Sequence, residues 1–175
     1  MTTPLDLKGK ERAQGVQKMF SKIAPNYDLM NRIMTAGQDI RWRKEVIRRA
    51  KLDKNDSLLD LGAGTGDIAR EGLKQHPAIS ALAADFTLEM MRAGKKDAHL
   101  NWSSADALNL PFPDKSFDAV VSGFLMRNVT DVSRTLKEQY RVLKSGGRIV
   151  ILDTTKPRPK ILTPFINIHL NHVIP

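Results

Sequence analysis

The first fifty residues carry apolar side chains at helical spacing. The clearest stripe has four members, Val16, Met19, Phe20 and Ile23. This spacing and the positions of Pro25 and Gly37 predict three amphipathic helices, over residues 10–23, 26–36 and 40–50. The third is expected to bury Ile40, Val46 and Ile47. We expect residues 1–50 to form an N-terminal helical lid, with plain packing on the flank of a sheet as the alternative.

From residue 57 onward, short apolar runs alternate with helical stretches. Strands are predicted over 57–61, 79–84, 100–103, 117–121 and 148–152, and helices over 67–75, 88–96, 131–143 and 161–173. Thr87 is expected to cap the helix that follows it, and Gly146-Gly147 to close the helix before the last strand. The alternation predicts an α/β protein, with a mostly parallel sheet of about five strands. We expect one domain over 1–175, with an α/β core at 51–160 and the start of a C-terminal part at 161–175.

The turn after the first predicted strand carries glycines at alternate positions, Gly62, Gly64 and Gly66. Glycine is needed where backbone approaches a ligand or adopts positive φ. The G-x-G-x-G spacing differs from the dinucleotide pattern G-x-G-x-x-G, and Asp67 stands where a phosphate-binding loop needs Lys. An acid there repels phosphate but suits a cationic amine or sulfonium. The turn therefore resembles motif I of the S-adenosylmethionine (SAM) dependent methyltransferases of Rossmann-like fold, with an ordinary glycine-rich turn as the alternative.

Two carboxylates follow later strands. Asp85 ends the second predicted strand, where an acid can accept hydrogen bonds from both ribose hydroxyls of NAD or of SAM. Asp106 follows the third strand, where a carboxylate can accept a hydrogen bond from the exocyclic amine of adenine while Leu108 covers the ring. The three glycines and these two acids, in this order, predict a SAM-binding fold.

Composition narrows the possible partners. The net charge of +9, from 28 Lys and Arg against 19 Asp and Glu, permits binding to nucleic acid or to an anionic membrane but requires neither. The basic cluster at 41–49 is typical of a solvated helix face, and no basic run is interleaved with aromatic residues, which argues against a nucleic-acid partner. There is no cysteine, and the pairing of His169 with His172 does not indicate a metal site. We expect a cytoplasmic protein, because no transmembrane run or signal peptide is evident.

Two further stretches narrow the family. They are Tyr27-Asp28-Leu29-Met30-Asn31 and Arg127-Asn128-Val129-Thr130-Asp131. With the segments at 110–114 and 140–147, they closely resemble the ubiquinone/menaquinone biosynthesis C-methyltransferases, from about residue 16 to 175. The resemblance implies a class I SAM-dependent methyltransferase that methylates a ring carbon of a lipophilic polyprenyl quinol, either demethylmenaquinol or a methoxy-benzoquinol or both. A lipophilic acceptor implies contact with the inner face of the membrane, and the basic cluster at 41–49 is the candidate for that contact.

The resemblance also indicates which residues hold the cofactor. The candidates are Asp60, Gly62, Gly64, Thr65, Gly66, Asp85, Phe86, Asp106, Ala107 and Gly123. Gly123 stands where relatives often have Ser, so its contact is expected to come from backbone or to be lost. Phe124-Leu125-Met126 departs from the usual Phe-Gly-Leu beside the expected quinol pocket, which leaves the acceptor open.

Methylation at a ring carbon requires a phenolate, because the ortho hydroxyl must lose its proton before the carbon becomes nucleophilic. The site has to align that carbon with the methyl group, exclude water and stabilise the phenolate. Arg127 is the candidate for stabilisation, since a guanidinium stays protonated. Tyr27 and Asn128 are candidates for positioning the hydroxyl, and His172 is a candidate base. Tyr27 could equally be a lid aromatic packed on the core.

Members of that family continue past the equivalent of Pro175 with two more strands in an antiparallel pair. Without them the strand at 148–152 would be an edge, and we expect a homodimer or aggregation through it. Two other functions stay open. One is SAM-dependent methylation of another small acceptor or of nucleic acid, and the other is a SAM-binding subunit without catalysis.

Overall fold

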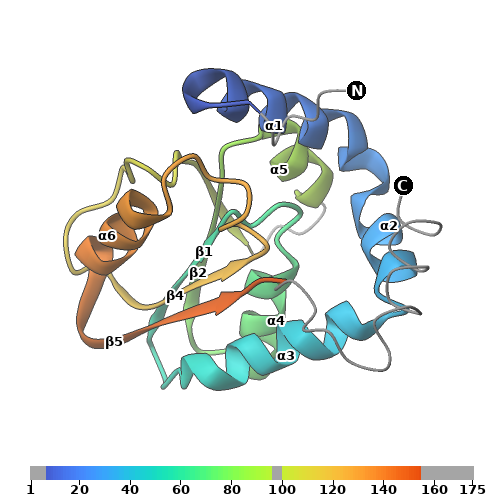
Figure 1. Ribbon diagram of the computed structural model, residues 1–175. Helices are drawn as coiled ribbons and strands as arrows, with labels where there is room; N and C mark the ends of the chain where they lie inside the picture. Colours follow the sequence, from blue (N-terminus) through green and yellow to red (C-terminus); the bar gives the residue numbers. More distant parts are fainter. Residues whose placement is uncertain (1–6, 96–99, 155–175) are drawn as a thin grey trace, which may run out of the picture.

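The computed structural model describes residues 7–95 and 100–154 (Figure 1). Its helices are α1 (Gly9–Ile23), α2 (Tyr27–Met34), α3 (Gln38–Ala50), α4 (Asp67–Gln75), α5 (Leu88–Gly94) and α6 (Val132–Val142), with a 3-10 turn at Ala24–Asn26. Its strands are β1 (Ser57–Leu61), β2 (Ser80–Asp85), β3 (Asn101–Ser104), β4 (Phe117–Gly123) and β5 (Leu143–Leu152). The helix predicted over 161–173, and His172 with it, lies outside the described residues.

The five strands form one sheet in the order β3-β2-β1-β4-β5, and all four neighbouring pairs are parallel. This confirms the α/β fold with a parallel sheet. The strand order reverses between β1 and β4, so the connections leave these two strands in opposite directions and open a crevice at their carboxyl ends. The glycine turn begins directly after β1 and therefore lies at that crevice.

Alternation along the strands produces two apolar layers. Leu58 of β1 and Val121 of β4 pack on one face with α3 and α4, whereas Leu59 and Val120 pack on the other with α6. In Figure 1, α3 and α4 lie along one side of the sheet and α6 along the opposite side. The middle of β4 is buried on both faces, as its continuous apolar run predicts.

Two predictions about helix ends are wrong. Gly146-Gly147 does not close α6, because β5 begins at Leu143 and contains both glycines. Thr87 precedes α5 but makes no side-chain capping hydrogen bond. Instead its backbone N–H donates to Asp85 Oδ1 at 2.7 Å, so the acid at the end of β2 organises this turn.

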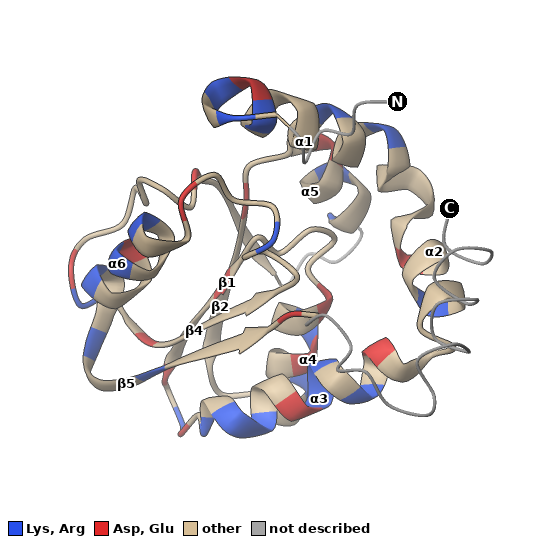
Figure 2. Cartoon of the chain, viewed as in Figure 1, with Lys and Arg blue, Asp and Glu red and all other residues tan. Residues whose placement is uncertain are grey.

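The N-terminal helices differ in how they pack. Val46 and Ile47 of α3 are buried as predicted, but Ile40 is 39% exposed, because its side chain points to a different side of α3 from that of the buried Asp39 next to it. Within α2, all of which the structure describes, no residue is buried, and Leu29 and Ile33 are 61% and 62% exposed. Lys and Arg residues lie along α3 (Figure 2). Two of them, Arg48 and Arg49, both pair with Glu45 at 2.6 Å. In the described part of the chain, no helix has the length and hydropathy to cross a membrane.

Candidate functional site

Three glycines shape the turn that joins β1 to α4. Gly62, Gly64 and Gly66 have φ angles of 67°, 58° and 86°. A Cβ atom at Gly66 would lie 2.8 Å from the Trp102 ring, so packing against β3 as well as backbone conformation requires glycine there. The N–H of Gly62 donates to the carbonyl of Ala84 at 2.8 Å, which ties the turn to the end of β2.

Asp85 connects that turn to the next crossover. Its Oδ2 accepts the backbone N–H of Gly64 at 2.7 Å, while its Oδ1 accepts that of Thr87. Burial raises the pKa of the carboxyl, and these backbone hydrogen bonds oppose the rise. The carboxylate is therefore held in one orientation by backbone groups from both sides.

Asp60 lies beneath the turn. It is fully buried in β1, where its Oδ2 accepts the N–H of Ala69 at 3.0 Å and its Oδ1 receives no hydrogen bond from the described residues. Burial raises its pKa to about 7, and the nearby Asp85 and Asp67 carboxylates act in the same direction. The side chain can therefore change its charge near neutral pH without touching solvent.

Charged side chains link α3 to the start of α4. Arg43 forms ion pairs with Asp67, the first residue of α4, and with Asp39, one turn earlier in α3, at 3.1 Å. Asp67 also pairs with Arg70 at 3.0 Å. Burial raises the pKa of Asp67, which Arg43 opposes. The acid at the glycine turn is thus neutralised by cations from two helices.

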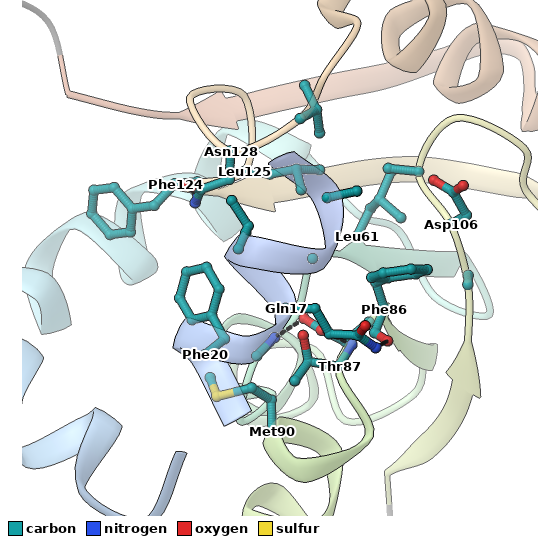
Figure 3. A pocket seen from close by; sticks show the side chains of 18 of the residues that line it. Gln17, Phe20, Leu61, Phe86, Thr87, Met90, Asp106, Phe124, Leu125 and Asn128 are labelled. Atoms are coloured by element: carbon teal, nitrogen blue, oxygen red, sulfur yellow. Dashed lines mark hydrogen bonds between the residues drawn. The ribbon is translucent and has the colours of Figure 1, made fainter. Parts of the chain in front are cut away.

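A cavity lies at the carboxyl ends of the strands, with α1 over it. Figure 3 shows Phe124, Leu125 and Asn128 along one side of it and Thr87 and Met90 along the other. The predicted site residues that line it are Tyr27, Gly62, Gly64, Asp85, Phe86, Asp106, Ala107, Gly123 and Asn128. Asp60, Thr65 and Gly66 are buried outside the lining, and Arg127 is exposed beside the cavity.

Phe124 organises the side of the cavity that follows β4. It has a φ of 59°, a left-handed conformation that is uncommon for a bulky residue, and its carbonyl accepts Asn128 Nδ2 at 2.9 Å. The Arg127 guanidinium lies 4.9 Å from the Phe124 ring and donates to Thr154 Oγ1 at 2.9 Å. Trp42 of α3 meets the same ring edge to face, with centroids 6.3 Å apart. Aromatic and guanidinium groups therefore gather at this end.

The sequence predicted an N-terminal helical lid but identified no residue of α1 as part of the site. Ala13, Val16, Gln17 and Phe20 all line it. Three hydrogen bonds hold the helix there: Arg12 to the Arg127 carbonyl at 2.9 Å, Gln17 to the Phe86 carbonyl at 3.3 Å, and Ser21 to Glu89 at 2.9 Å. The apolar stripe did not identify which residues of α1 would face a ligand cavity, because helical spacing does not show what the stripe packs on.

Tyr27 closes the cavity from the start of α2. Its ring stands edge to face with Phe20 at 6.0 Å and lies 3.6 Å from the position a Cβ would take at Gly64. Burial raises the pKa of its hydroxyl, while a hydrogen bond with Asn31 and the charges of Arg43 and Arg127 oppose the rise. The phenol is therefore protonated at neutral pH, so its hydroxyl has a proton to donate.

Comparison with known proteins agrees with this geometry. A model of the ubiE/COQ5 methyltransferase family matches residues 7–175. The ubiquinone/menaquinone biosynthesis C-methyltransferase UbiE of Desulfotalea psychrophila is 45% identical over 94% of this chain and 68% of its own length. The demethylmenaquinone methyltransferase of Deinococcus radiodurans is 37% identical over 95% of this chain and 71% of its own.

Solved structures show the same architecture. One from Methanococcus maripaludis, named as a candidate S-adenosyl-L-methionine-dependent methyltransferase, superimposes with a TM-score of 0.71. It is 25% identical, over 89% of this chain and 72% of its own. The parallel sheet, the glycine turn at its crevice and the extent of the sequence match lead to one conclusion. The chain belongs to the ubiE/COQ5 methyltransferase family.

Proposed function

We propose that the protein transfers a methyl group from SAM to a ring carbon of a polyprenyl quinol in quinone biosynthesis. The observation that carries the proposal is a single cavity that joins the glycine turn and two carboxylates to an apolar wall. The names of the relatives from Desulfotalea psychrophila and Deinococcus radiodurans support a quinone-type acceptor.

The cavity has groups that suit the ribose and the adenine of the cofactor. The glycine turn presents backbone without side chains at Gly62 and Gly64, and Asp85 beside it suits the ribose hydroxyls. Asp106 is exposed, and its Oδ1 accepts the N–H of Leu108 at 2.9 Å, which orients the carboxylate next to Ala107. This arrangement suits the amine and face of an adenine ring. When bound, SAM supplies an electrophilic methyl group on a positively charged sulfur.

The remaining residues act on the acceptor. Phe20, Leu125 and the other apolar residues exclude water, which strengthens every electrostatic interaction in the cavity. In this proposal Tyr27 donates a hydrogen bond to the acceptor oxygen, and Asn128 donates the Nδ2 hydrogen that the Phe124 carbonyl does not accept. Arg127, at the rim, provides the positive charge that stabilises a phenolate there. His172 remains a candidate base.

Methyl transfer tests the proposal directly. Protein is incubated with methyl-labelled SAM and, in parallel, with extracted demethylmenaquinol, methoxy-benzoquinol or RNA. We expect label in a quinol and none in RNA, and Arg127→Ala should lower turnover at least tenfold with SAM still bound. Arg92→Ala, at an exposed arginine of α5, is the matched control. Label in RNA alone, or SAM binding without transfer to any acceptor, would contradict the proposal.

We also propose that α2 and the start of α3 touch an anionic membrane surface. Leu29, Ile33 and Ile40 are exposed, and the exposed Arg41 follows Ile40 directly in α3. Apolar side chains next to basic ones suit an anionic lipid surface. The protein should sediment with anionic vesicles, and Ile33→Glu or Arg41→Glu should reduce this severalfold. Lys137→Glu on α6 is the control, and equal sedimentation of all variants would contradict the membrane contact.

The edge of the sheet supports a homodimer. β5 is the last strand on its side of the described sheet, and Ile151 in it is exposed. An uncovered strand edge is a template for pairing with another copy. Sedimentation equilibrium should show a concentration-dependent dimer that Ile151→Lys weakens. A monomer at every concentration would contradict this proposal.

A further inference from the structure

A hydrogen bond joins α2 to the glycine turn across 37 residues of sequence. The hydroxyl of Thr65, between Gly64 and Gly66, donates to Asp28 Oδ1 at 2.6 Å. Thr65 is 4% exposed and does not line the cavity. Its single proton is committed to Asp28, so its hydroxyl serves the helix rather than donating to a ligand.

α2 depends on this bond because it has little packing of its own. None of its residues is buried, and its apolar side chains Leu29 and Ile33 face outward. Asp28 is its second residue and thus lies in its first turn, where a carboxylate also favours the helix. A charge-assisted bond to a buried hydroxyl is about twice as strong as a neutral one.

The residue before Asp28 is Tyr27, which lines the cavity. Its ring lies 3.6 Å from the position that a Cβ would take at Gly64, the neighbour of Thr65, so Tyr27 and Asp28 both face the same turn. The backbone between Tyr27 and Asp28 is therefore fixed by the turn that would hold the cofactor.

We propose that Asp28 is a positioning residue, which acts through Thr65 to hold Tyr27 in the cavity and so couples the acceptor side of the site to the glycine turn. The assignment of an acceptor side rests on the proposed function, but the coupling does not. The groups whose charge acts on the Tyr27 hydroxyl are Arg43, Arg127 and Asp85, with Asn31 as its hydrogen-bond partner.

Tyrosine titration tests the coupling without cofactor or quinol. The other tyrosine, Tyr140, is 76% exposed on α6, so Tyr140→Phe leaves Tyr27 as the sole tyrosine. In this background, tyrosinate absorbance after a rapid pH jump reports the pKa of Tyr27, which burial raises above 10.0. Asp28→Ala and Thr65→Val should each return it toward that value, and Thr65→Ser should retain the raised pKa. Asp53→Ala, at an exposed acid, is the control for lost charge.

A double-mutant cycle separates the pair from independent effects. Asp28→Ala with Thr65→Val should shift the pKa no further than either single change, because both remove the same bond. The proposal would be overturned by additive pKa shifts, or by single variants in which Tyr27 titrates as it does in the protein that carries Tyr140→Phe alone. If Asp28→Ala does not fold, the comparison of Thr65→Val with Thr65→Ser still decides it.

Calorimetry with SAM provides a second readout. Asp28→Ala should weaken SAM binding threefold to tenfold, because the turn loses a support rather than a ligand contact. Quinol methylation, where present, should lose at least tenfold in kcat. Coupled titration without quinol methylation would disprove the proposed function and leave the positioning role intact, whereas unchanged SAM affinity in a variant with a shifted Tyr27 pKa would disprove coupling to the turn.

Discussion

The carboxylate of Asp85 accepts the backbone N–H of Gly64 at 2.7 Å, so the end of β2 and the centre of the glycine turn form one unit. An amide at position 85 keeps one acceptor but loses the charge and puts a donor opposite one of two backbone N–H groups. Asp85→Asn should therefore weaken SAM binding by about 10- to 100-fold, the cost of one or two charge-assisted hydrogen bonds. Isothermal calorimetry measures this, with Asp53→Asn as the control. Equal affinity of both variants would show that Asp85 only shapes the turn.

Asp60→Asn should change how stability depends on pH. The pKa of Asp60 is about 7 in the fold, above that of an exposed aspartate, so the folded protein holds the proton more tightly. The stability that this proton contributes is fully present below about pH 4 and is lost as the pH rises through about 7. Over that window the loss is on the order of 4 kcal/mol. The amide oxygen of Asn can still accept the N–H of Ala69.

Urea unfolding at a series of pH values measures this effect. The free energy of unfolding of the Asn variant, relative to the original protein, should increase from pH 4 to pH 8. Parallel pH profiles for the two proteins would show that Asp60 titrates in its ordinary range.

Gly66→Ala should destabilise the fold more than Gly146→Ala. Both glycines have positive φ, at 86° and 82°, so both substitutions bear about 1–2 kcal/mol of backbone strain. A Cβ at Gly146 meets nothing within 4 Å, whereas at Gly66 it meets Trp102 at 2.8 Å. The collision should add about 1–3 kcal/mol. Thermal unfolding compares the pair, and equal losses would show that β3 moves aside freely.

Arg43→Ala should be among the most destabilising changes at a charged position. Asp39 is 1% exposed, and removing its cation leaves a buried carboxylate unpaired, which costs about 3–5 kcal/mol. Arg43→Lys should recover only part of this, since one ammonium cannot bridge Asp39 and Asp67 as a guanidinium does. Arg48→Ala, at an exposed pair that solvent screens, should have little effect on stability. Denaturant unfolding would contradict the prediction if Ala at positions 43 and 48 cost the same.

The part of the site that sequence predicts is the part built from strand ends. Parallel strands place their carboxyl ends together, so the glycine turn, Asp85 and Asp106 were expected at one edge and all reach the same cavity. The positions of these residues in the sequence are enough to predict that they meet at one site, because each lies at or just after the end of a strand.

Contacts between distant segments could not be predicted in this way. The bond from Thr65 to Asp28 and that from Arg12 to the Arg127 carbonyl depend on where two helices settle over the sheet. The exposure of Ile40 has the same origin, since helical spacing identifies an apolar stripe but not the surface that covers it. The glycines at 146 and 147 were misread because glycine also marks irregularities within strands, and the pairing of β4 with β5 is irregular between Leu143 and Arg148, where both glycines lie.

The joint between α6 and β5 has no spare residue, because the helix ends at Val142 and the strand begins at Leu143. Neighbouring strand residues point to opposite faces, and here Ile149 packs in the layer of α6 while Val150 packs in that of α3 and α4. Pairing with β4 is continuous from Arg148 to Leu152, so one amino acid inserted in that stretch would exchange the two layers for the residues after it. Natural insertions and deletions should therefore be found in loops such as 111–116 and be absent from this part of β5, where the face that each side chain takes depends on its register with β4.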